Sequence, residues 1–209
     1  MKTLLKAIAV ASLATATAAQ AEVSLTGGMV SDYVFRGNSL ADASAYASLD
    51  YATGGFYAGV WAIDNDDSLE RDVYAGYATT VGEIGVDVSY TNYSYSNLGD
   101  NNETDLTIAV TFAGLGLSYA DVSAEDAAGN DIDDSSVVTA NYTVGNINLL
   151  VGQVDSDAAN EDYNWVELST SADVAGLTAA LTVGGQFSSD ADDANDGYIV
   201  LDLSKSFDL

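Results

Sequence analysis

The 209-residue chain contains neither cysteine nor histidine. Without them it cannot carry Ser-His-Asp or Cys-His nucleophilic machinery, a His-based or Cys-based zinc site, or a disulfide bond. Any enzymatic mechanism would have to depend on carboxylates alone. Paired carboxylates are too common in this chain to mark such a site. We therefore expect no enzymatic activity and no cofactor.

Basic residues are also scarce: 5 Lys and Arg stand against 32 Asp and Glu, which gives a formal net charge of −27. Such a surface repels nucleic acid and attracts cations. After residue 21 no apolar run is long enough for a transmembrane helix. The 13 Tyr, 5 Phe and 2 Trp are nevertheless too many for a disordered acidic chain. A closed β-barrel is the remaining way for such a chain to span a membrane.

Residues 1–21 have the pattern of a cleaved secretory signal peptide. Lys2 and Lys6 precede an apolar run that starts at Ala7, and 19–21 form a small-x-small cleavage site. The apolar run is too short, and too rich in Ala and Thr, to be a membrane anchor. Residues 22–209 would then form one exported domain. Its three basic residues stand against all 32 acidic ones, a formal charge of −29.

The exported part of the chain alternates between apolar and polar residues with a period of two, as a β-strand does. In the last segment, residues 199, 201, 203, 207 and 209 are apolar, whereas Asp202, Ser204 and Ser206 fall between them. In 104–113, Leu106, Ile108 and Val110 alternate with Asp105 and Thr107. The polar face is small and rich in hydroxyl groups, which suits a wet lumen. The pattern predicts twelve strands, at 23–36, 44–52, 55–64, 69–80, 84–95, 104–113, 115–122, 135–144, 147–155, 162–172, 177–188 and 197–208.

The connections between these strands differ in length according to their order. Every second connection is a short, glycine-containing turn, and those between are longer and acidic; the longer ones are 37–43, 64–68, 96–103, 122–134, 156–161 and 189–196. Outer-membrane barrels have short periplasmic turns and longer outside loops. The chain is therefore predicted to be all-β, a closed antiparallel up-and-down transmembrane β-barrel of about 12 strands with both termini periplasmic.

The same alternation predicts which charged side chains face the lumen, since an ionised group facing lipid is unfavourable. In the first strand, Tyr33 and Phe35 would share the outward face, whereas Asp32 and Arg36 would point inward. Arg36 would either form a buried network with Asp32 or Asp202, or supply a constriction charge that selects solutes. The candidates for the lumen and its constriction are Asp32, Arg36, Asp50, Asp87, Asp105, Glu167 and Asp202.

Two other residue groups have weaker interpretations. Tyr and Trp near strand ends could form the aromatic girdles of a barrel or pack across strands; they are Tyr33, Tyr46, Tyr51, Tyr57, Trp61, Tyr93, Tyr95, Tyr163 and Trp165. Acidic loops could bind Ca²⁺ or Mg²⁺, with candidates Asp64, Asp66, Asp131, Asp133, Asp190 and Asp192. None of these loops fits the EF-hand pattern, so solvated loops are the favoured interpretation.

Three segments resemble the TorF-type porin family of small proteobacterial outer-membrane proteins. They are residues 30–37 (VSDYVFRG), 55–61 (GFYAGVW) and 70–77 (ERDVYAGY), so the resemblance covers roughly residues 28–77. The chain departs from the family pattern at 38–40, where a Ser-Gln pair is expected, and at Arg71. The resemblance implies an outer-membrane barrel with a pore.

Together these features predict an outer-membrane porin-like channel for passive diffusion of small cationic or neutral solutes. Acidic loops and an acidic lumen would make it prefer cations. Its other partners would be outer-membrane lipid and lipopolysaccharide, and not nucleic acid. A non-conducting structural barrel is the alternative, because twelve strands lie between the filled eight-stranded barrels and the open sixteen-stranded ones. A soluble, acidic, secreted β-sandwich is the third possibility.

Overall fold

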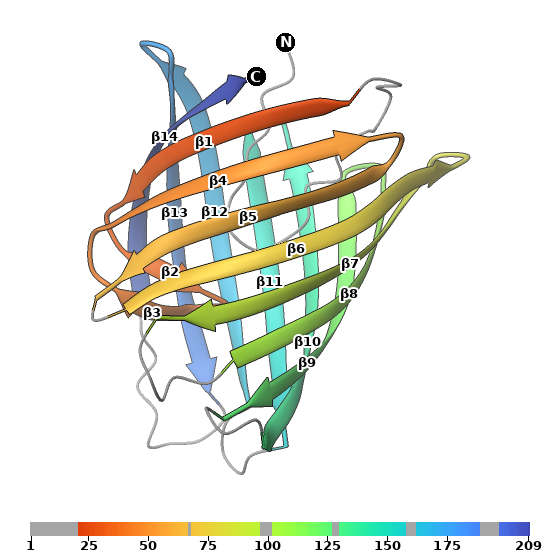
Figure 1. Cartoon of the computed structure of the whole chain (residues 1–209), viewed down its shortest axis with the longest axis vertical. Coiled ribbons are helices and arrows are strands. Elements are labelled where there is room, and N and C mark those ends of the chain that lie inside the picture. The colour runs from red at the N-terminus through yellow and green to blue at the C-terminus, as the bar shows by residue number, and fades with distance from the viewer. Residues whose placement is uncertain (1–20, 67, 97–101, 127–129, 158–161, 189–196) are drawn as a thin grey trace.

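The computed structural model describes residues 21–66, 68–96, 102–126, 130–157, 162–188 and 197–209. Twelve of its strands form one closed antiparallel barrel in chain order (Figure 1). They are β1 (Glu22–Val30), β4 (Ser44–Thr53), β5 (Phe56–Asn65), β6 (Ser68–Val81), β7 (Ile84–Tyr95), β8 (Asn102–Phe112), β9 (Leu115–Glu125), β10 (Asp131–Val144), β11 (Ile147–Ser156), β12 (Tyr163–Val174), β13 (Leu177–Ser188) and β14 (Gly197–Asp208). The predicted twelve-stranded barrel is confirmed.

The barrel closes between its first and last strands. β1 pairs with β4 on one side and with β14 on the other, where Ser24 lies opposite Asp208. A further backbone hydrogen bond of 2.9 Å runs from the N–H of Leu209 to the carbonyl of Val23. Closure satisfies the edge groups that an open sheet would expose. The alternative of a two-layered β-sandwich is therefore wrong.

Side chains sort to the two faces of the wall by the alternation of each strand. On β8, Leu106, Ile108 and Val110 are exposed on the outside, whereas Asp105 and Ala109 are buried inside. Large apolar groups are likewise exposed along the other wall strands. The described residues include no helix that is long and apolar enough to cross a membrane. An outside of apolar groups and an inside of ionisable ones is the reverse of a soluble protein.

The short turns and both ends of the wall lie at one end of the barrel (Figure 1). These turns contain residues with positive φ, mostly glycines such as Gly54, Gly82 and Gly145, which have no Cβ to clash in this region. The strand ends that the longer connections join lie at the opposite end. Two strands reach further into these connections than the sequence predicted, because β9 continues to Glu125 and β10 begins at Asp131.

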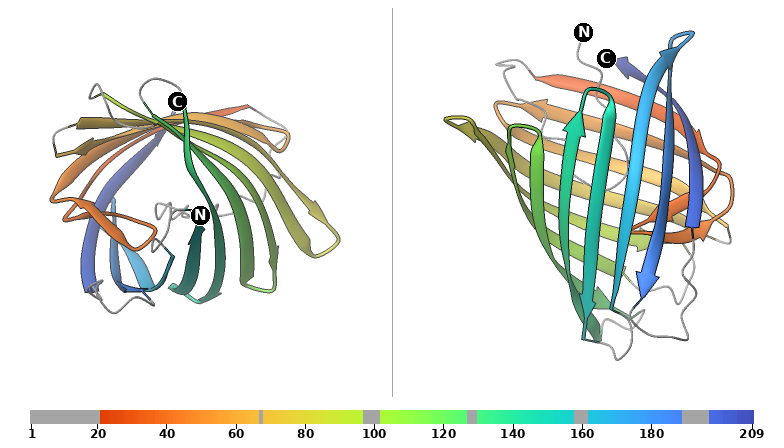
Figure 2. Two further views of the ribbon diagram at one scale, coloured as in Figure 1. Left: turned by 90° about the horizontal axis from the view of Figure 1, so that it is seen from below. Right: turned by 180° about the vertical axis from the view of Figure 1, so that it is seen from behind.

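The predicted strand at 23–36 is wrong in its second half. The wall strand ends at Val30, and the chain then forms a separate two-stranded hairpin from β2 (Tyr33–Phe35) and β3 (Asn38–Ala41). Seen along the barrel, this hairpin (orange) lies inside the ring of wall strands (Figure 2, left). It leaves the wall beside β14, where the N–H of Ser31 donates to the carbonyl of Leu201 at 2.9 Å. Tyr33 and Phe35 therefore face the interior and not the outside.

The predicted signal peptide, apart from Ala21, lies outside the described residues and stays a prediction.

Candidate functional site

The hairpin crosses the lumen at the end of the barrel with the longer connections. Its turn consists of Arg36 and Gly37, which both have positive φ, 50° and 83°. A Cβ on Gly37 would lie 2.6 Å from Cβ of Trp165 on β12, so only glycine permits this approach. The turn of a hairpin that leaves the wall at β1 thus touches β12, on another part of the wall.

Arg36 fixes the hairpin to β8. Its Nη1 donates to Oε1 of Glu103 at 2.9 Å, and its Nη2 donates to Oδ2 of Asp105 at 2.5 Å. The Arg36 side chain is only 11% exposed. Burial acts to lower the pKa of Arg36, but Asp105 and the other acidic neighbours outweigh it, so the pKa is raised. The guanidinium therefore stays charged.

Other hairpin contacts reach different parts of the wall. The hydroxyl of Tyr33 donates to Oε1 of Glu70 at 2.8 Å, and Nδ2 of Asn38 donates to the hydroxyl of Tyr163 at 2.7 Å. Burial, and then the charge of Glu70, raise the pKa of Tyr33 far above its ordinary value, so the phenol remains a donor. The Phe35 ring packs on Tyr93, with centroids 5.6 Å apart. The hairpin is therefore held on several sides and narrows the lumen.

Tyrosine–carboxylate pairs line the rest of the inner wall. Each carboxylate accepts a hydrogen bond from a tyrosine on another strand: Tyr46–Asp202, Tyr57–Asp87, Tyr74–Asp50, Tyr93–Asp105 and Tyr198–Glu167. These bonds hold both groups against the wall and fix where each negative charge lies. The predicted girdle is wrong for most of its members, since these tyrosines point inward with Tyr33, Trp61, Tyr163 and Trp165.

Glycines let several of these rings lie flat on the wall. Gly76 is the direct cross-strand partner of Tyr57, and a Cβ at Gly76 would lie 2.3 Å from the tyrosine hydroxyl. The same arrangement pairs Gly59 with Tyr74 and Gly184 with Tyr198. Because the rings occupy the space that a glycine leaves free, they take little room from the lumen.

The structure places the predicted lumen residues as follows. Asp50, Asp87, Asp105, Glu167 and Asp202 all lie on the inward face, and their role in conduction stays a prediction. Asp32 lies half-buried in the bend before the hairpin. Arg36 also lies inside, but the predicted partners Asp32 and Asp202 are wrong. The chain turns away from the wall before Arg36, so that its side chain reaches β8.

Three inward carboxylates were not among the predicted site residues. Glu70 and Asp72 lie on β6 and Glu103 on β8. Glu70 and Asp72 alternate with Arg71 and Val73 with a period of two, so the strand pattern already predicted that the side chains of Glu70 and Asp72 point inward. Glu103 is two residues from Asp105 and shares its face. The sequence did not predict that these carboxylates lie near Arg36, because their proximity depends on the hairpin.

The weak metal candidates remain unassigned. Asp64 and Asp66 are exposed at the end of β5. Asp190 and Asp192 lie outside the described residues, as do the side chains of Asp131 and Asp133. Across the part of the chain that the structure describes, no group of three or more acidic, His or Cys side chains is placed to hold a metal ion.

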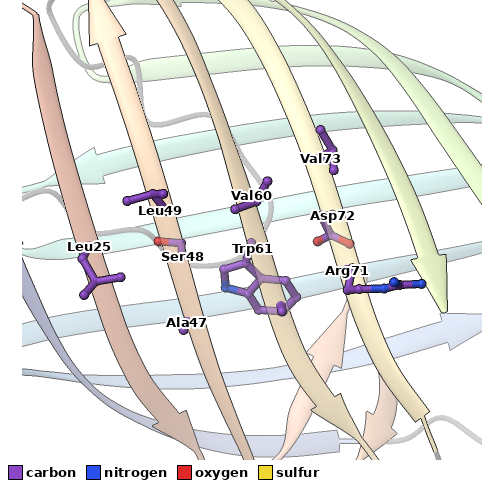
Figure 3. Close-up of a pocket in the computed structure, with 10 residues that line it drawn as sticks. Leu25, Ala47, Ser48, Leu49, Val60, Trp61, Arg71, Asp72 and Val73 are labelled. Carbon is purple, nitrogen blue, oxygen red and sulfur yellow. The ribbon is translucent and has the colours of Figure 1, made fainter. Parts of the chain in front are cut away.

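A groove of about 410 Å³ lies on the wall at β1, β4, β5 and β6 (Figure 3). Leu25, Leu49, Val60 and Val73 form one side of it, and these directly paired residues are exposed on the outer face. The next row of paired residues, Ala47, Ala62 and Arg71, forms the other side, and Ser48, Trp61 and Asp72 also line the groove. The groove therefore belongs to the apolar exterior, whereas the ionisable side chains of the candidate site lie in the lumen.

Comparison with known proteins identifies a family. Residues 14–206 match the family described as "Bacterial protein of unknown function (Gcw_chp)", so the chain belongs to it. No curated protein matches the sequence. The resemblance to TorF-type porins is supported at the level of a porin fold only, and the TorF name stays a prediction.

Solved structures with similar folds include a porin. The KdgM porin in complex with disordered oligogalacturonate has a TM-score of 0.57 and 11% identity, over 89% of this chain and 99% of that one. A protein from a study of in-meso crystallisation of membrane proteins has a TM-score of 0.60 and 10% identity, over 90% and 84%. Acinetobacter baumannii OccAB4 has a TM-score of 0.50 and 14% identity, over 90% and 62%. At these identities the likeness is one of fold.

Proposed function

We propose that this protein is a porin-like channel of the Gram-negative outer membrane, which lets small solutes diffuse passively and prefers cations. The observation that carries the proposal is that apolar and ionisable side chains are distributed in the opposite way to a soluble protein. Large apolar side chains are exposed around the barrel, whereas ionisable side chains line its interior. Lipid around the barrel accounts for the exposed apolar side chains, and a polar path inside it accounts for the ionisable ones. The KdgM porin shares the fold, which supports a role as a channel without catalysis.

The orientation that we propose places the termini and short turns in the periplasm and the longer acidic loops outside the cell. It follows the usual asymmetry of such barrels. Exposed aromatic side chains near the short-turn end support a membrane interface there; they are Tyr51, Phe56, Tyr77, Phe112, Tyr142 and Phe207. The outer rim would then lie among lipopolysaccharide, and the chain would reach the membrane through the predicted signal peptide.

Cation preference follows from the charges inside. Asp50, Glu70, Asp72, Asp87, Glu103, Asp105, Glu167 and Asp202 face the lumen, and Arg36 is the one basic residue there among those described. A low-dielectric wall focuses this negative field along the axis and raises the local concentration of cations. In this proposal the hairpin, which lies inside the ring of wall strands, forms the constriction, and Arg36 contributes a positive charge there.

A non-conducting barrel is the second candidate, and the packing of the hairpin favours it. Val30, Tyr33, Ala41 and Ile63 form a buried cluster under the hairpin, with Tyr33 only 1% exposed. A second buried cluster, which includes Val137, Leu150 and Trp165, fills the side towards β9–β12. If these clusters block the lumen, the acidic rim would act only as a surface for cations or partners.

Planar-bilayer recording separates the two candidates. Pure refolded protein should produce discrete current steps in KCl, and heat-dependent migration on a gel should show that the same preparation is a folded barrel. A folded preparation that inserts without current steps would leave only the non-conducting barrel.

A further inference from the structure

Four carboxylates gather around the hairpin. Glu70 and Asp72 come from β6, and Glu103 and Asp105 come from β8. Asp72 interacts electrostatically with the other three. Arg36 pairs with Glu103 and Asp105. When all four are ionised, this one guanidinium leaves three negative charges uncompensated.

Two oxygens of this cluster have no hydrogen-bond partner in the described part of the chain. They are Oδ1 of Asp72 and Oδ1 of Asp105, in residues that are 8% and 5% exposed. Buried carboxylate oxygens normally accept at least one hydrogen bond. Asp87 shows the usual situation, because its carboxylate accepts from the hydroxyl of Tyr57, whose oxygen lies 3.0 Å from both carboxylate oxygens. The oxygens on Asp72 and Asp105 are acceptors that the protein itself leaves unused.

One aromatic ring lies between the two aspartates. Tyr93 on β7 is the cross-strand partner of Asp72, and its hydroxyl donates to Oδ2 of Asp105 at 3.0 Å. Phe35 of the hairpin packs on the same ring. A donor that reaches the free oxygens would therefore also meet aromatic surface, which attracts organic cations.

We propose that Asp72 and Asp105 form a subsite for the primary ammonium group of a small organic cation. The inference rests on the proposed function, because the solute must reach the constriction through the lumen. An ammonium group offers three donors, which suits unpaired acceptors such as those of Asp72 on β6 and Asp105 on β8, two strands with only β7 between them. A divalent metal suits the site less well, since Ca²⁺ requires six to eight oxygens.

Calorimetry on refolded protein in detergent tests the subsite, with methylammonium chloride as the probe. Tetramethylammonium carries the same charge without an N–H donor and should bind far more weakly. Asp72→Asn should lower methylammonium affinity about tenfold or more, as expected for the loss of a charge-assisted hydrogen bond. Asp121→Asn makes the same change on the outer face of β9 and should leave the affinity unaltered. Asp87→Asn removes a lumen charge that is already hydrogen-bonded and should have a much smaller effect than Asp72→Asn.

Three results would overturn the subsite: equal affinity for both ammonium probes, equal losses in Asp72→Asn and Asp87→Asn, or no methylammonium binding to folded wild-type protein. The comparison of the two probes on the wild type remains decisive if Asp72→Asn does not fold. Conductance in KCl, recorded on the same preparation, keeps the two proposals apart. Current without methylammonium binding would refute the subsite alone, and binding without current would refute the pore alone.

Discussion

At the scale of single residues, a few side chains hold the hairpin inside the barrel. Arg36 brings the hairpin turn to Glu103 and Asp105, and Gly37 allows the turn to touch Trp165. Period-two alternation in the sequence predicted the inward direction of Asp105 and Asp202. It could not predict the ion pairs of Arg36, because they join segments about seventy residues apart. They also depend on the hairpin, and the alternation of its first residues predicted a continuation of the wall strand.

Replacing Arg36 with Gln should widen the channel and weaken the fold. The change leaves Glu103 and Asp105 without their cation, and breaking a buried ion pair costs about 3–5 kcal/mol. We expect a larger single-channel conductance and a lower midpoint in urea unfolding. Arg71→Gln is the matched control, because it removes an exposed arginine on the outer face of β6. Equal effects of the two variants would contradict the role of Arg36.

Replacing Gly76 with Ala should narrow the lumen. The new Cβ would overlap Tyr57, so the ring must swing inward and lose its hydrogen bonds to Asp87. Such overpacking costs about 1–3 kcal/mol, and the displaced ring should reduce conductance. In the control Gly27→Ala, a Cβ on the outward face of β1 meets nothing within 4 Å. Unchanged conductance in Gly76→Ala would mean that Tyr57 does not border the path.

At the scale of elements, the hairpin β2–β3 is the part of the fold that differs most from the sequence-based expectation. Residues 30–36 alternate as a wall strand does, so the local pattern predicted that the first wall strand continues through them. The backbone instead turns inward after Val30, because Tyr33 and Phe35 gain contacts with Glu70 and Tyr93 inside the barrel. Tertiary contacts of this kind override local periodicity and are invisible in a single sequence.

Replacing residues 33–41 with a Gly/Ser segment of equal length should open the channel while the wall stays closed. The hairpin supplies no strand to the barrel, so heat-dependent gel migration should persist. Conductance should rise severalfold, because the contacts that hold the hairpin across the lumen are gone. A folded variant with wild-type conductance would show that the hairpin does not form the constriction.

The two faces of β8 should tolerate a charge very differently in a membrane. Ile108 is 50% exposed on the outer face, and the neighbouring Thr107 points inward. An arginine that faces lipid costs about 2–4 kcal/mol near the bilayer midplane. We therefore expect Ile108→Arg to refold poorly into lipid vesicles and Thr107→Arg to refold well. Equal yields would contradict a lipid-facing exterior.

At the scale of the whole molecule, the sequence predicted more than at the other scales. The alternation of short turns and longer acidic connections indicated an even-stranded closed barrel, and β1 and β14 do pair. The net charge of −27 is a property of composition and needs no structure. The buried clusters under the hairpin and at β9–β12 arise only from closure, so how much of the lumen they fill could not be predicted.

The central claim is that an acidic lumen conducts cations in preference to anions. A reversal-potential measurement across a bilayer with a tenfold KCl gradient tests it most directly, because the sign of the potential shows which ion carries the current. We predict a potential close to the equilibrium potential of K⁺. A potential near zero, or one displaced towards the equilibrium potential of Cl⁻, would contradict the account.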